Sequence, residues 1–210
     1  MNSHTKVGIV DYGVGNIGSI INMLKKNGVL NLNVLRTPKD FDLNPEKIIL
    51  PGVGSFDNAI KKIESNFSLS FLKEKILSDK IPTLGICLGM QILTKSSEEG
   101  SLNGLGLIDA ETKKINISNN SSLKVPHMGW NYVTKDNESF LTDGLDNTDF
   151  YFVHSYFVEC RNPRDSILRT NFHIPFTSAF QCDNIYGVQF HPEKSHKHGM
   201  KLLKNFIDLC

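Results

Sequence analysis

A cysteine between two glycines is the first feature of the sequence that could do chemistry. Cys87 lies in the run Gly85-Ile86-Cys87-Leu88-Gly89, between an apolar β-type run and a helical stretch. This is the thiol counterpart of the G-x-S-x-G elbow, whose sharp turn lifts a nucleophile out of the sheet edge. The following helix N-terminus favours a thiolate, and the N–H of Leu88 points at a developing oxyanion. The pattern predicts a nucleophile at Cys87; the alternative is an ordinary buried cysteine.

A histidine and a carboxylate two positions apart could supply the base. His191 and Glu193 end the run Gly187-Val188-Gln189-Phe190-His191-Pro192-Glu193. Alternate side chains share a face in an extended chain, and Pro192 disfavours a helix at His191. Glu193 can then hold one ring nitrogen and leave the other for the thiol. The order Cys, His, Glu follows the logic of a catalytic triad, and the alternative is a surface histidine.

A glycine-rich loop could supply a second oxyanion donor. Gly52 and Gly54 flank Val53 in the run Leu50-Pro51-Gly52-Val53-Gly54-Ser55-Phe56, which follows an apolar β-type run. Two glycines let the backbone approach a substrate and rotate its N–H groups. Taken alone the run is a simple β-to-α turn, so its catalytic interpretation depends on the triad.

The first half of the chain predicts the elements that would position these groups. Strands are expected at Val7–Asp11, Leu32–Arg36, Lys47–Leu50 and Pro82–Cys87, and helices at Ile17–Lys26, Phe56–Glu64, Leu69–Ser78 and Leu88–Lys95. Strands that alternate with helices predict a mainly parallel sheet with helices on both faces.

The second half is richer in strands. Strands are expected at Thr112–Ile117, Trp130–Thr134, Phe150–Cys160, Phe176–Gln181 and Ile185–Phe190, with a surface loop at Asn116–Ser122 and a helix at Gly199–Leu209. The expected class is α/β, with a smaller strand-rich part in the second half. The sequence contains no linker or internal repeat, so we expect one domain over residues 1–210.

Composition and charge exclude several classes of function. Lys+Arg 23 against Asp+Glu 22 leaves a net charge of +1, so we expect no nucleic-acid partner. The N-terminus lacks the features of a signal peptide, and no apolar run approaches the roughly 18 residues that span a bilayer. We therefore expect a cytoplasmic protein that does not associate with a membrane. The cysteines Cys87, Cys160, Cys182 and Cys210 are scattered, which argues against disulfides and zinc, and no metal or cofactor is expected.

These motifs resemble those of the class I, triad-type glutamine amidotransferases, over nearly the whole chain. Within that class the motifs are similar to those of the glutaminase subunits of imidazole glycerol phosphate synthases. The matching runs are DYG at residues 11–13 with GN at 15–16, PGVGSF at 51–56, GICLGMQ at 85–91, SEEG at 97–100, PHMGWN at 126–131, YFVHSY at 151–156 and HPEKS at 191–195. The elbow and H-P-E are common to the class, whereas PHMGWN and the lysine of HPEKS are more particular to this subunit.

The resemblance implies a flavodoxin-like fold and a glutaminase. It implies that Cys87 attacks the side-chain amide of glutamine, that Val53 and Leu88 form the oxyanion hole, and that His191 and Glu193 complete the triad. By the same similarity the glutamine is held by Gly52, Gln91, Glu99, His154, Ser155 and Tyr156. Glu99 would be the counter-charge of the α-ammonium group.

The resemblance also implies a partner. The family pairs this subunit with a (β/α)8-barrel cyclase/synthase subunit (HisF-like), which uses the ammonia to make imidazole glycerol phosphate and aminoimidazole carboxamide ribotide in histidine biosynthesis. Gly15, Asn16, Trp130 and Lys194 match positions that the family places at or near this heterodimer interface. Members tend to be poor glutaminases until the partner binds its ligand, which a flexible Gly52–Gly54 loop would explain.

Three other functions stay open on the sequence alone. Gly13-Val14-Gly15-Asn16-Ile17-Gly18 is a literal G-x-G-x-x-G, but the acidic residue expected after the next strand of a dinucleotide site is missing. A γ-glutamyl hydrolase or cysteine peptidase on the same fold could use the same triad. A paralogous glutaminase could supply ammonia to a surface-sugar amidation pathway.

Overall fold

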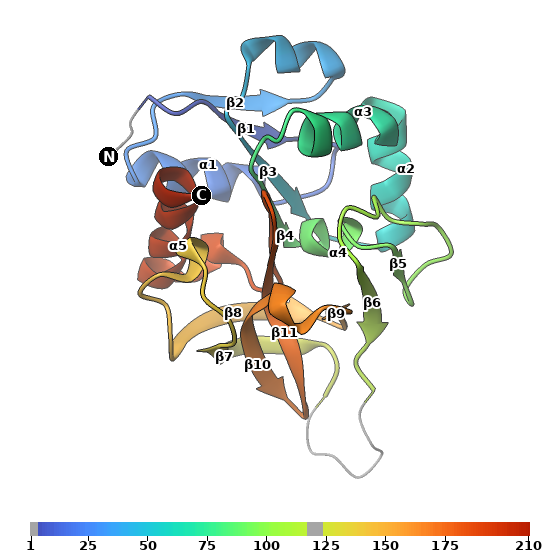
Figure 1. The fold of residues 1–210 in the computed structure, drawn as a ribbon, viewed down its shortest axis with the longest axis vertical. Helices are drawn as coiled ribbons and strands as arrows, with labels where there is room; N and C mark the ends of the chain where they lie inside the picture. Colours follow the sequence, from blue (N-terminus) through green and yellow to red (C-terminus); the bar gives the residue numbers. More distant parts are fainter. Residues whose placement is uncertain (1–3, 117–123) are drawn as a thin grey trace.

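A sheet of twelve strands organises the part of the chain that the computed structural model describes, residues 4–116 and 124–210 (Figure 1). Its first half is parallel and runs in the order β2-β1-β3-β4-β12. The bounds are β1 Val7–Val10, β2 Leu32–Leu35, β3 Lys47–Gly52, β4 Thr83–Cys87 and β12 Ile185–Val188. Each of these strands lies within a predicted strand or extends it by two residues, so the mainly parallel sheet is confirmed.

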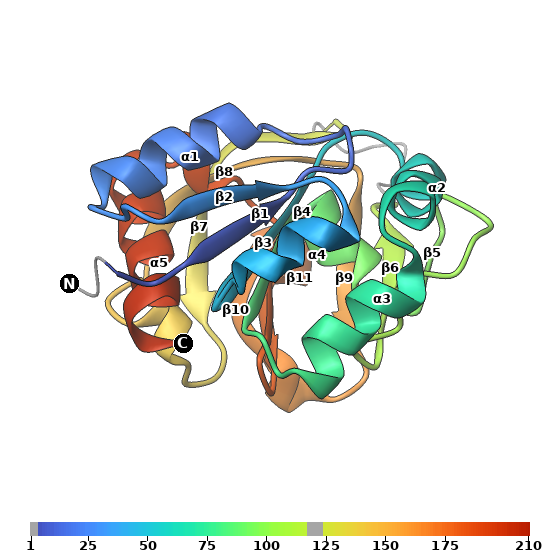
Figure 2. The same cartoon turned by 90° about the horizontal axis from the view of Figure 1, so that it is seen from above.

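Helices cover both faces of this parallel part (Figure 2). One face carries α1 (Ile17–Lys26) and α5 (His196–Leu209), and the other carries α2 (Phe56–Asn66), α3 (Leu69–Lys73) and α4 (Leu88–Ile92). Neighbouring side chains of β3 enter opposite cores: Ile49 packs with the α1–α5 side, whereas Ile48 and Leu50 pack with the α2–α4 side. This alternation explains why the strand is buried at every position.

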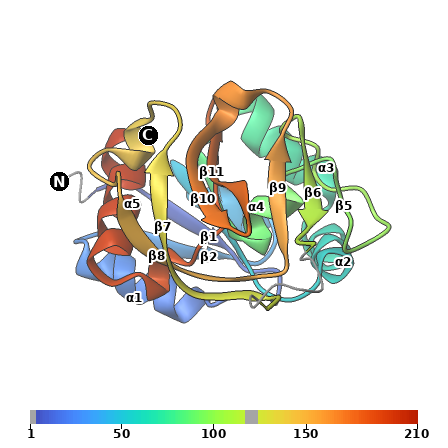
Figure 3. The same ribbon diagram turned by 90° about the horizontal axis from the view of Figure 1, so that it is seen from below.

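The second half continues the sheet with antiparallel strands (Figure 3). From β12 the order is β11 (Ile174–Cys182), β10 (Ser166–Phe172), β7 (His127–Lys135) and β8 (Thr148–His154). A branch is formed by β9 (Tyr156–Cys160), β6 (Ala110–Lys114) and β5 (Ser96–Ser97). The described residues also include short 3₁₀-helices and one short π-helix. The 3₁₀-helices are η1 Pro38–Leu43, η3 Phe140–Thr142, η4 Pro163–Asp165 and η5 Pro192–Lys194, and the π-helix is η2 Glu74–Ser78.

Several predicted elements differ from the observed ones. The single strand expected at Phe150–Cys160 is two strands separated at Ser155, because β8 pairs with β7 whereas β9 pairs with β6 and β11. The helix expected at Leu88–Lys95 ends at Ile92, since the chain turns there to form β5. The loop expected at Asn116–Ser122 lies outside the described residues except for Asn116.

The carboxyl ends of the parallel strands meet at one edge of the sheet. Gly52 ends β3 and is in register with Cys87 at the end of β4, and Gln189 and His191 follow the end of β12 on the other side of β4. Residues from three separate parts of the sequence are therefore neighbours at this edge, where parallel sheets place their ligand sites.

Candidate active site

Cys87 sits on a strained turn between β4 and α4. Its backbone has φ 55° and ψ −110°, a region that non-glycine residues seldom occupy and that costs about 1–3 kcal/mol. The turn also brings backbones into contact. A Cβ added to Gly85 would lie 2.6 Å from the carbonyl oxygen of Gly89, and one added to Gly89 would lie 1.8 Å from that of Leu50. Both glycines of the motif are therefore required by close approach.

His191 is held from one side by Glu193. Its Nδ1 lies 2.8 Å from Oε1 of Glu193, and the two side chains are 2% and 1% exposed. Because the carboxylate accepts the proton of Nδ1, the neutral ring carries its lone pair on Nε2. That atom is buried and makes no hydrogen bond to the described residues. The ring is thus oriented with its basic nitrogen available.

The charge state of His191 follows from its neighbours. Burial opposes the charged ring, but the interactions with Cys87 and Glu193 outweigh burial and raise the pKa of His191 to about 10. An imidazolium beside the thiol stabilises a thiolate, so the arrangement suits nucleophilic attack followed by proton donation.

The main chain around His191 is also fixed. The hydroxyl of Ser195 donates to the carbonyl of His191 at 2.7 Å and accepts from the N–H of Tyr151 at 3.0 Å. The N–H of His191 donates to the carbonyl of Tyr151 at 2.9 Å. Ser195 therefore joins His191 to β8; the sequence matched this serine to the family but gave it no role.

The side chain of Gln189 also reaches the thiol, and the sequence did not predict this contact. The side-chain amide of Gln189 donates to Sγ of Cys87 at 3.7 Å, and its oxygen accepts from Nε2 of Gln91 at 3.0 Å. Nε2 of Gln91 also donates to the carbonyl of Tyr156 at 3.0 Å. Gln189 is fully buried. Its place two residues before His191 in an extended run was the available signal, since alternate side chains share a face.

A cavity of about 310 Å³ opens at Cys87. His191, Val53 and Leu88 share its wall with the thiol. The expected substrate residues Gln91, Glu99, His154, Ser155 and Tyr156 line it as well. Gly54 of the predicted oxyanion loop also lines it, as do Pro126 and Val153, to which the sequence gave no role. The structure thus brings together residues that lie as far apart in the sequence as Val53 and His191.

Two of the expected site residues lie behind this wall. A Cβ added to Gly52 would lie 2.6 Å from the hydroxyl of Tyr12 and 2.9 Å from the N–H nitrogen of Gly89. Gly52 therefore allows β3 to approach the elbow closely. Glu193 contacts the base rather than the cavity.

Glu99 and His154, which both line the cavity, differ in what they offer a ligand. Glu99 is partly buried, and burial, opposed by the N–H of Phe56 and reinforced by the charge of Asp57, raises its pKa. A cation in the cavity would reverse that effect. His154 uses both ring nitrogens within the protein, on the carbonyl of Tyr156 at 2.8 Å and on His127 at 2.9 Å. A hydrogen bond from His154 to a ligand would therefore come from its backbone.

The residues expected at a partner interface lie outside the cavity but near it. Trp130 is 46% exposed, and its ring centroid lies 6.1 Å from that of Tyr151. Nζ of Lys194 lies 5.3 Å from the same Tyr151 ring. Gly15 and Asn16 belong to the turn after β1, at the same sheet edge, and a Cβ added to Gly15 would lie 3.3 Å from the Pro51 ring.

The described residues contain no group of three or more His, Cys, Asp or Glu side chains that could hold a metal ion. Within the same residues no helix has the length and apolar character needed to cross a membrane.

Known proteins resemble this chain over nearly its whole length. Residues 8–209 match the family model of class I glutamine amidotransferases. The chain is 50% identical over 202 residues to a Methanococcus maripaludis protein named imidazole glycerol phosphate synthase subunit HisH 2, with 96% of this chain and 98% of that protein covered. It is 45% identical over 207 residues to the HisH subunit of Leptospira borgpetersenii, with coverages of 97% and 100%.

Solved structures agree on the fold. PurLQS from Thermotoga maritima superposes with a TM-score of 0.71 at 18% identity, covering 97% of each chain. A glutamine amidotransferase from the same organism gives a TM-score of 0.59 at 22% identity, covering 98% of this chain and 83% of the other.

Proposed function

The chain belongs to the class I glutamine amidotransferase family, and from that membership we propose that it is the glutaminase subunit of an imidazole glycerol phosphate synthase. The observation that carries the proposal is the position of Cys87 and His191 on the wall of one cavity, with the carboxylate of Glu193 held on Nδ1 of His191 behind that wall. The full-length similarity to proteins named as HisH subunits supports the choice of synthase.

The first half of the reaction is acyl transfer to the thiol. The thiolate of Cys87 attacks the side-chain carbonyl carbon of glutamine, and the oxygen of the tetrahedral intermediate accepts from the N–H groups of Leu88 and Val53. The N–H of Leu88 is free for this role because the first amides of a helix have no intrahelical partner. His191 then donates its Nε2 proton to the departing nitrogen, which leaves as ammonia.

The second half is hydrolysis of the glutamyl thioester. With its Nε2 deprotonated, His191 accepts a proton from water as the water attacks the thioester carbon. The C–S bond breaks, glutamate leaves and Cys87 returns to a thiolate beside the imidazolium. Glu193 keeps the ring in the orientation that both halves need.

The rest of the cavity suits the backbone end of glutamine. In this proposal Glu99 is the counter-charge of the α-ammonium group, and Gln91, His154, Ser155 and Tyr156 bound the site. Gly52 keeps β3 close to the elbow, where a side chain would intrude.

Ammonia released into water would be protonated and lost to a synthase reaction, so a partner subunit is part of the proposal. The partner is a (β/α)8-barrel cyclase/synthase that contacts Gly15, Asn16, Trp130 and Lys194. Gly15 lies against Pro51, so a partner seated there is near the loop that carries Val53. Residues 1–210 act as a single glutamine amidotransferase domain in this proposal, and the cytoplasm is the compartment in which it works.

Glutamate release tests this function. The purified chain is assayed with glutamine, alone and with a candidate barrel synthase and its nucleotide ligand, alongside Cys87→Ala. We expect activity that rises with the liganded partner and is absent in the variant. No glutamate under any condition, or equal activity in Cys87→Ala, would refute the proposal.

A second acceptor pathway has one observation in its favour. Relatives from Methanococcus maripaludis and Pseudomonas aeruginosa carry the name HisH 2, which indicates more than one such subunit in those organisms. A paralogue that supplies ammonia to a surface-sugar amidation pathway would use the same cavity. Complementation of a histidine auxotroph separates the two, because only the histidine-pathway subunit restores growth without histidine.

A further inference from the structure

The loop proposed to carry the second oxyanion donor is supported at its two ends and not in its middle. Val53, Gly54 and Ser55 connect β3 to α2. Gly54 has φ +106°, and a Cβ added there would meet no atom within 4 Å. Val53 is 43% exposed. Because the described residues leave open space at Gly54 and nearly half of Val53 exposed, the direction of the Val53 N–H depends on how the two ends of the loop are held.

The end at β3 is held by a buried tyrosine. The hydroxyl of Tyr12 donates to the carbonyl of Pro51 at 2.6 Å, and the Tyr12 side chain is fully buried. This bond fixes the peptide unit that precedes Gly52.

The end at α2 is held by Glu99. Oε2 of Glu99 accepts from the backbone N–H of Phe56, the first residue of α2, at 2.9 Å. The preceding residue, Ser55, makes no capping hydrogen bond with its side chain. Glu99 therefore supplies from another part of the chain the acceptor that a helix N-terminus needs.

This contact is one half of a reciprocal connection. Asp57, the second residue of α2, accepts in return from the N–H groups of Ser101 and Leu102, each at 3.1 Å. Gly100 packs so closely that an added Cβ would lie 1.9 Å from Oδ1 of Asp57. The start of α2 and the segment around Glu99 are therefore joined by hydrogen bonds in both directions.

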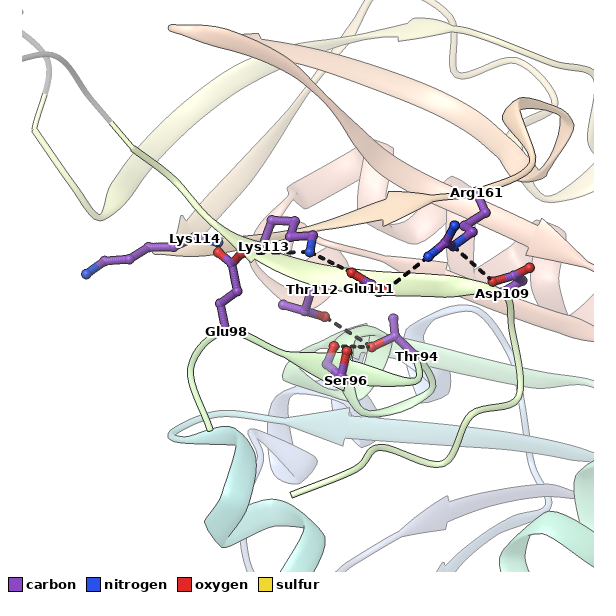
Figure 4. A network of polar contacts seen from close by, with 9 residues as sticks. All are labelled: Thr94, Ser96, Glu98, Asp109, Glu111, Thr112, Lys113, Lys114 and Arg161. Carbon is purple, nitrogen blue, oxygen red and sulfur yellow. Dashed lines mark hydrogen bonds and ion pairs between the residues drawn. The ribbon is translucent and has the colours of Figure 1, made fainter. Parts of the chain in front are cut away.

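The segment is itself attached to the sheet. The N–H of Glu98 donates to the carbonyl of Thr112 at 2.9 Å, and Oε2 of Glu98 accepts from the N–H of Lys114 at 2.7 Å. Figure 4 shows this region, where charged side chains follow β6 and Thr94 contacts Thr112 beneath them. The segment that carries Glu99 is thus hydrogen-bonded to β6 on one side and to α2 on the other.

We propose that Glu99 is a positioning residue for the oxyanion hole, in addition to its role as counter-charge for the substrate. One carboxylate oxygen holds the N–H of Phe56 and so sets the helical end of the Val53–Ser55 loop, while Oε1 is left for the α-ammonium group. This inference rests on the proposed glutaminase function. It assigns to one carboxylate both the recognition of the substrate and the support of the group that stabilises its reaction.

Two substitutions at Glu99 separate the roles. Glu99→Gln removes the charge but keeps an oxygen that can accept from Phe56, whereas Glu99→Ala removes both. Glutamate release is measured in the complex with the synthase and its ligand. We expect both variants to raise KM, Glu99→Gln to keep kcat within about threefold of the wild type, and Glu99→Ala to lose roughly tenfold or more in kcat, since one oxyanion donor is worth about 10²–10³. Where saturation is not reached, kcat/KM of the two variants is compared, because both have lost the charge.

Alkylation of Cys87 by iodoacetamide distinguishes positioning from a general structural defect. Displacement at a saturated carbon develops no oxyanion, so all variants should alkylate Cys87 at the wild-type rate. Asp109→Ala is the matched control: this exposed carboxylate belongs to a surface ion-pair network with Lys95 and Arg161, and its loss should leave kcat within about twofold. If Glu99→Ala does not fold by circular dichroism, Glu99→Leu takes its place.

Each outcome decides between the two roles. A kcat for Glu99→Ala equal to that of Glu99→Gln would overturn the positioning role and leave only the ammonium contact. Slower alkylation in step with the lost kcat would overturn it too, as a structural defect. If wild-type complex releases no glutamate from glutamine, the proposed function itself fails, and the inference fails with it.

Discussion

The rings of His127 and His154 are joined by a hydrogen bond of 2.9 Å between Nδ1 of His127 and Nε2 of His154. Nδ1 of His154 faces the carbonyl of Tyr156 and therefore carries a proton, so Nε2 of His154 is the acceptor and His127 the donor. Nε2 of His127 in turn accepts from the side-chain amide of Asn131 at 3.2 Å. The contacts form a directed chain of neutral rings behind the cavity, with one tautomer assigned to each.

We predict that both rings stay neutral well below pH 6.5. Burial lowers the pKa of His127 to about 4. Burial also outweighs the hydrogen bond to the Tyr156 carbonyl and, with the neighbouring rings of His127 and His191, lowers the pKa of His154 to about 3. Between these values and 6.5 the unfolded chain binds more protons than the folded one, so stability falls as the pH falls through this window. From pH 7 to pH 5 the free energy of unfolding should decrease by roughly 2–4 kcal/mol from this pair.

Nitrogen NMR at pH 5.5 checks the prediction directly, since both rings should give the signature of the Nδ1–H tautomer. Imidazolium signals from both would contradict it. Replacing both histidines with phenylalanine should flatten the dependence of unfolding free energy on pH between 7 and 5.

The amide of Gln189 is predicted to activate the thiol. It donates to Sγ of Cys87, and a bond to a charged acceptor is worth about 1.5 kcal/mol or more at good geometry, somewhat less at this longer sulfur distance. Gln189→Leu should therefore slow alkylation of Cys87 by iodoacetamide at pH 7 by roughly 3- to 10-fold. Gln181→Leu is the control, because Gln181 bonds to Ser139 away from the site. Equal alkylation rates in the two variants would refute a role for Gln189.

Gly89 is predicted to tolerate no side chain. An added Cβ would lie 1.8 Å from the carbonyl oxygen of Leu50, so Gly89→Ala must displace β3 or α4. We expect a loss of roughly 3 kcal/mol or more in denaturant unfolding. Gly18 in α1 has open space around its Cβ, and Gly18→Ala should instead stabilise by about 0.5–1 kcal/mol. A small effect at both glycines would mean that the elbow relaxes freely.

Trp130 is predicted to contribute to binding of the synthase subunit. A half-exposed indole at a binding surface often contributes about 2 kcal/mol or more to the free energy of binding. Trp130→Ala should therefore raise the dissociation constant of the complex by roughly 30-fold. Calorimetric titration with the proposed barrel subunit measures this affinity, and the rate of alkylation of Cys87 should not change. Phe140→Ala is the control, because Phe140 is 70% exposed in η3 and is not among the residues proposed for the interface. If the two variants bound the synthase subunit with equal affinity, Trp130 would not contribute to the interface.

The sequence predicted the features that local chemistry determines. Cys87 between its glycines, the extended His191-Pro192-Glu193 run and the alternation of strands and helices are all local patterns. The structure places Cys87 and His191 on one cavity wall, with Glu193 bound to the ring of His191. The helix α1 has its predicted bounds because Asn27 and Gly28 end it as the pattern required.

The missed features depend on contacts between distant residues. The link from Glu99 to Phe56 spans 43 positions and leaves no local signal. The strand β10 was not predicted because its register with β11 shifts on either side of Leu168, so inward and outward side chains do not alternate there. The break at Ser155 was invisible because the two strands it separates are both apolar, and only their different partners divide them.

The position of β4 in the sheet has a consequence for synthesis of the chain on the ribosome. β4 pairs with β3, made before it, and with β12, made about a hundred residues later. A nascent chain that ends between them has the elbow cysteine but no base, and one edge of its central strand is unpaired. Reactivity toward glutamine should therefore arise only when the last strand docks, which makes hydrolysis a report on completed folding.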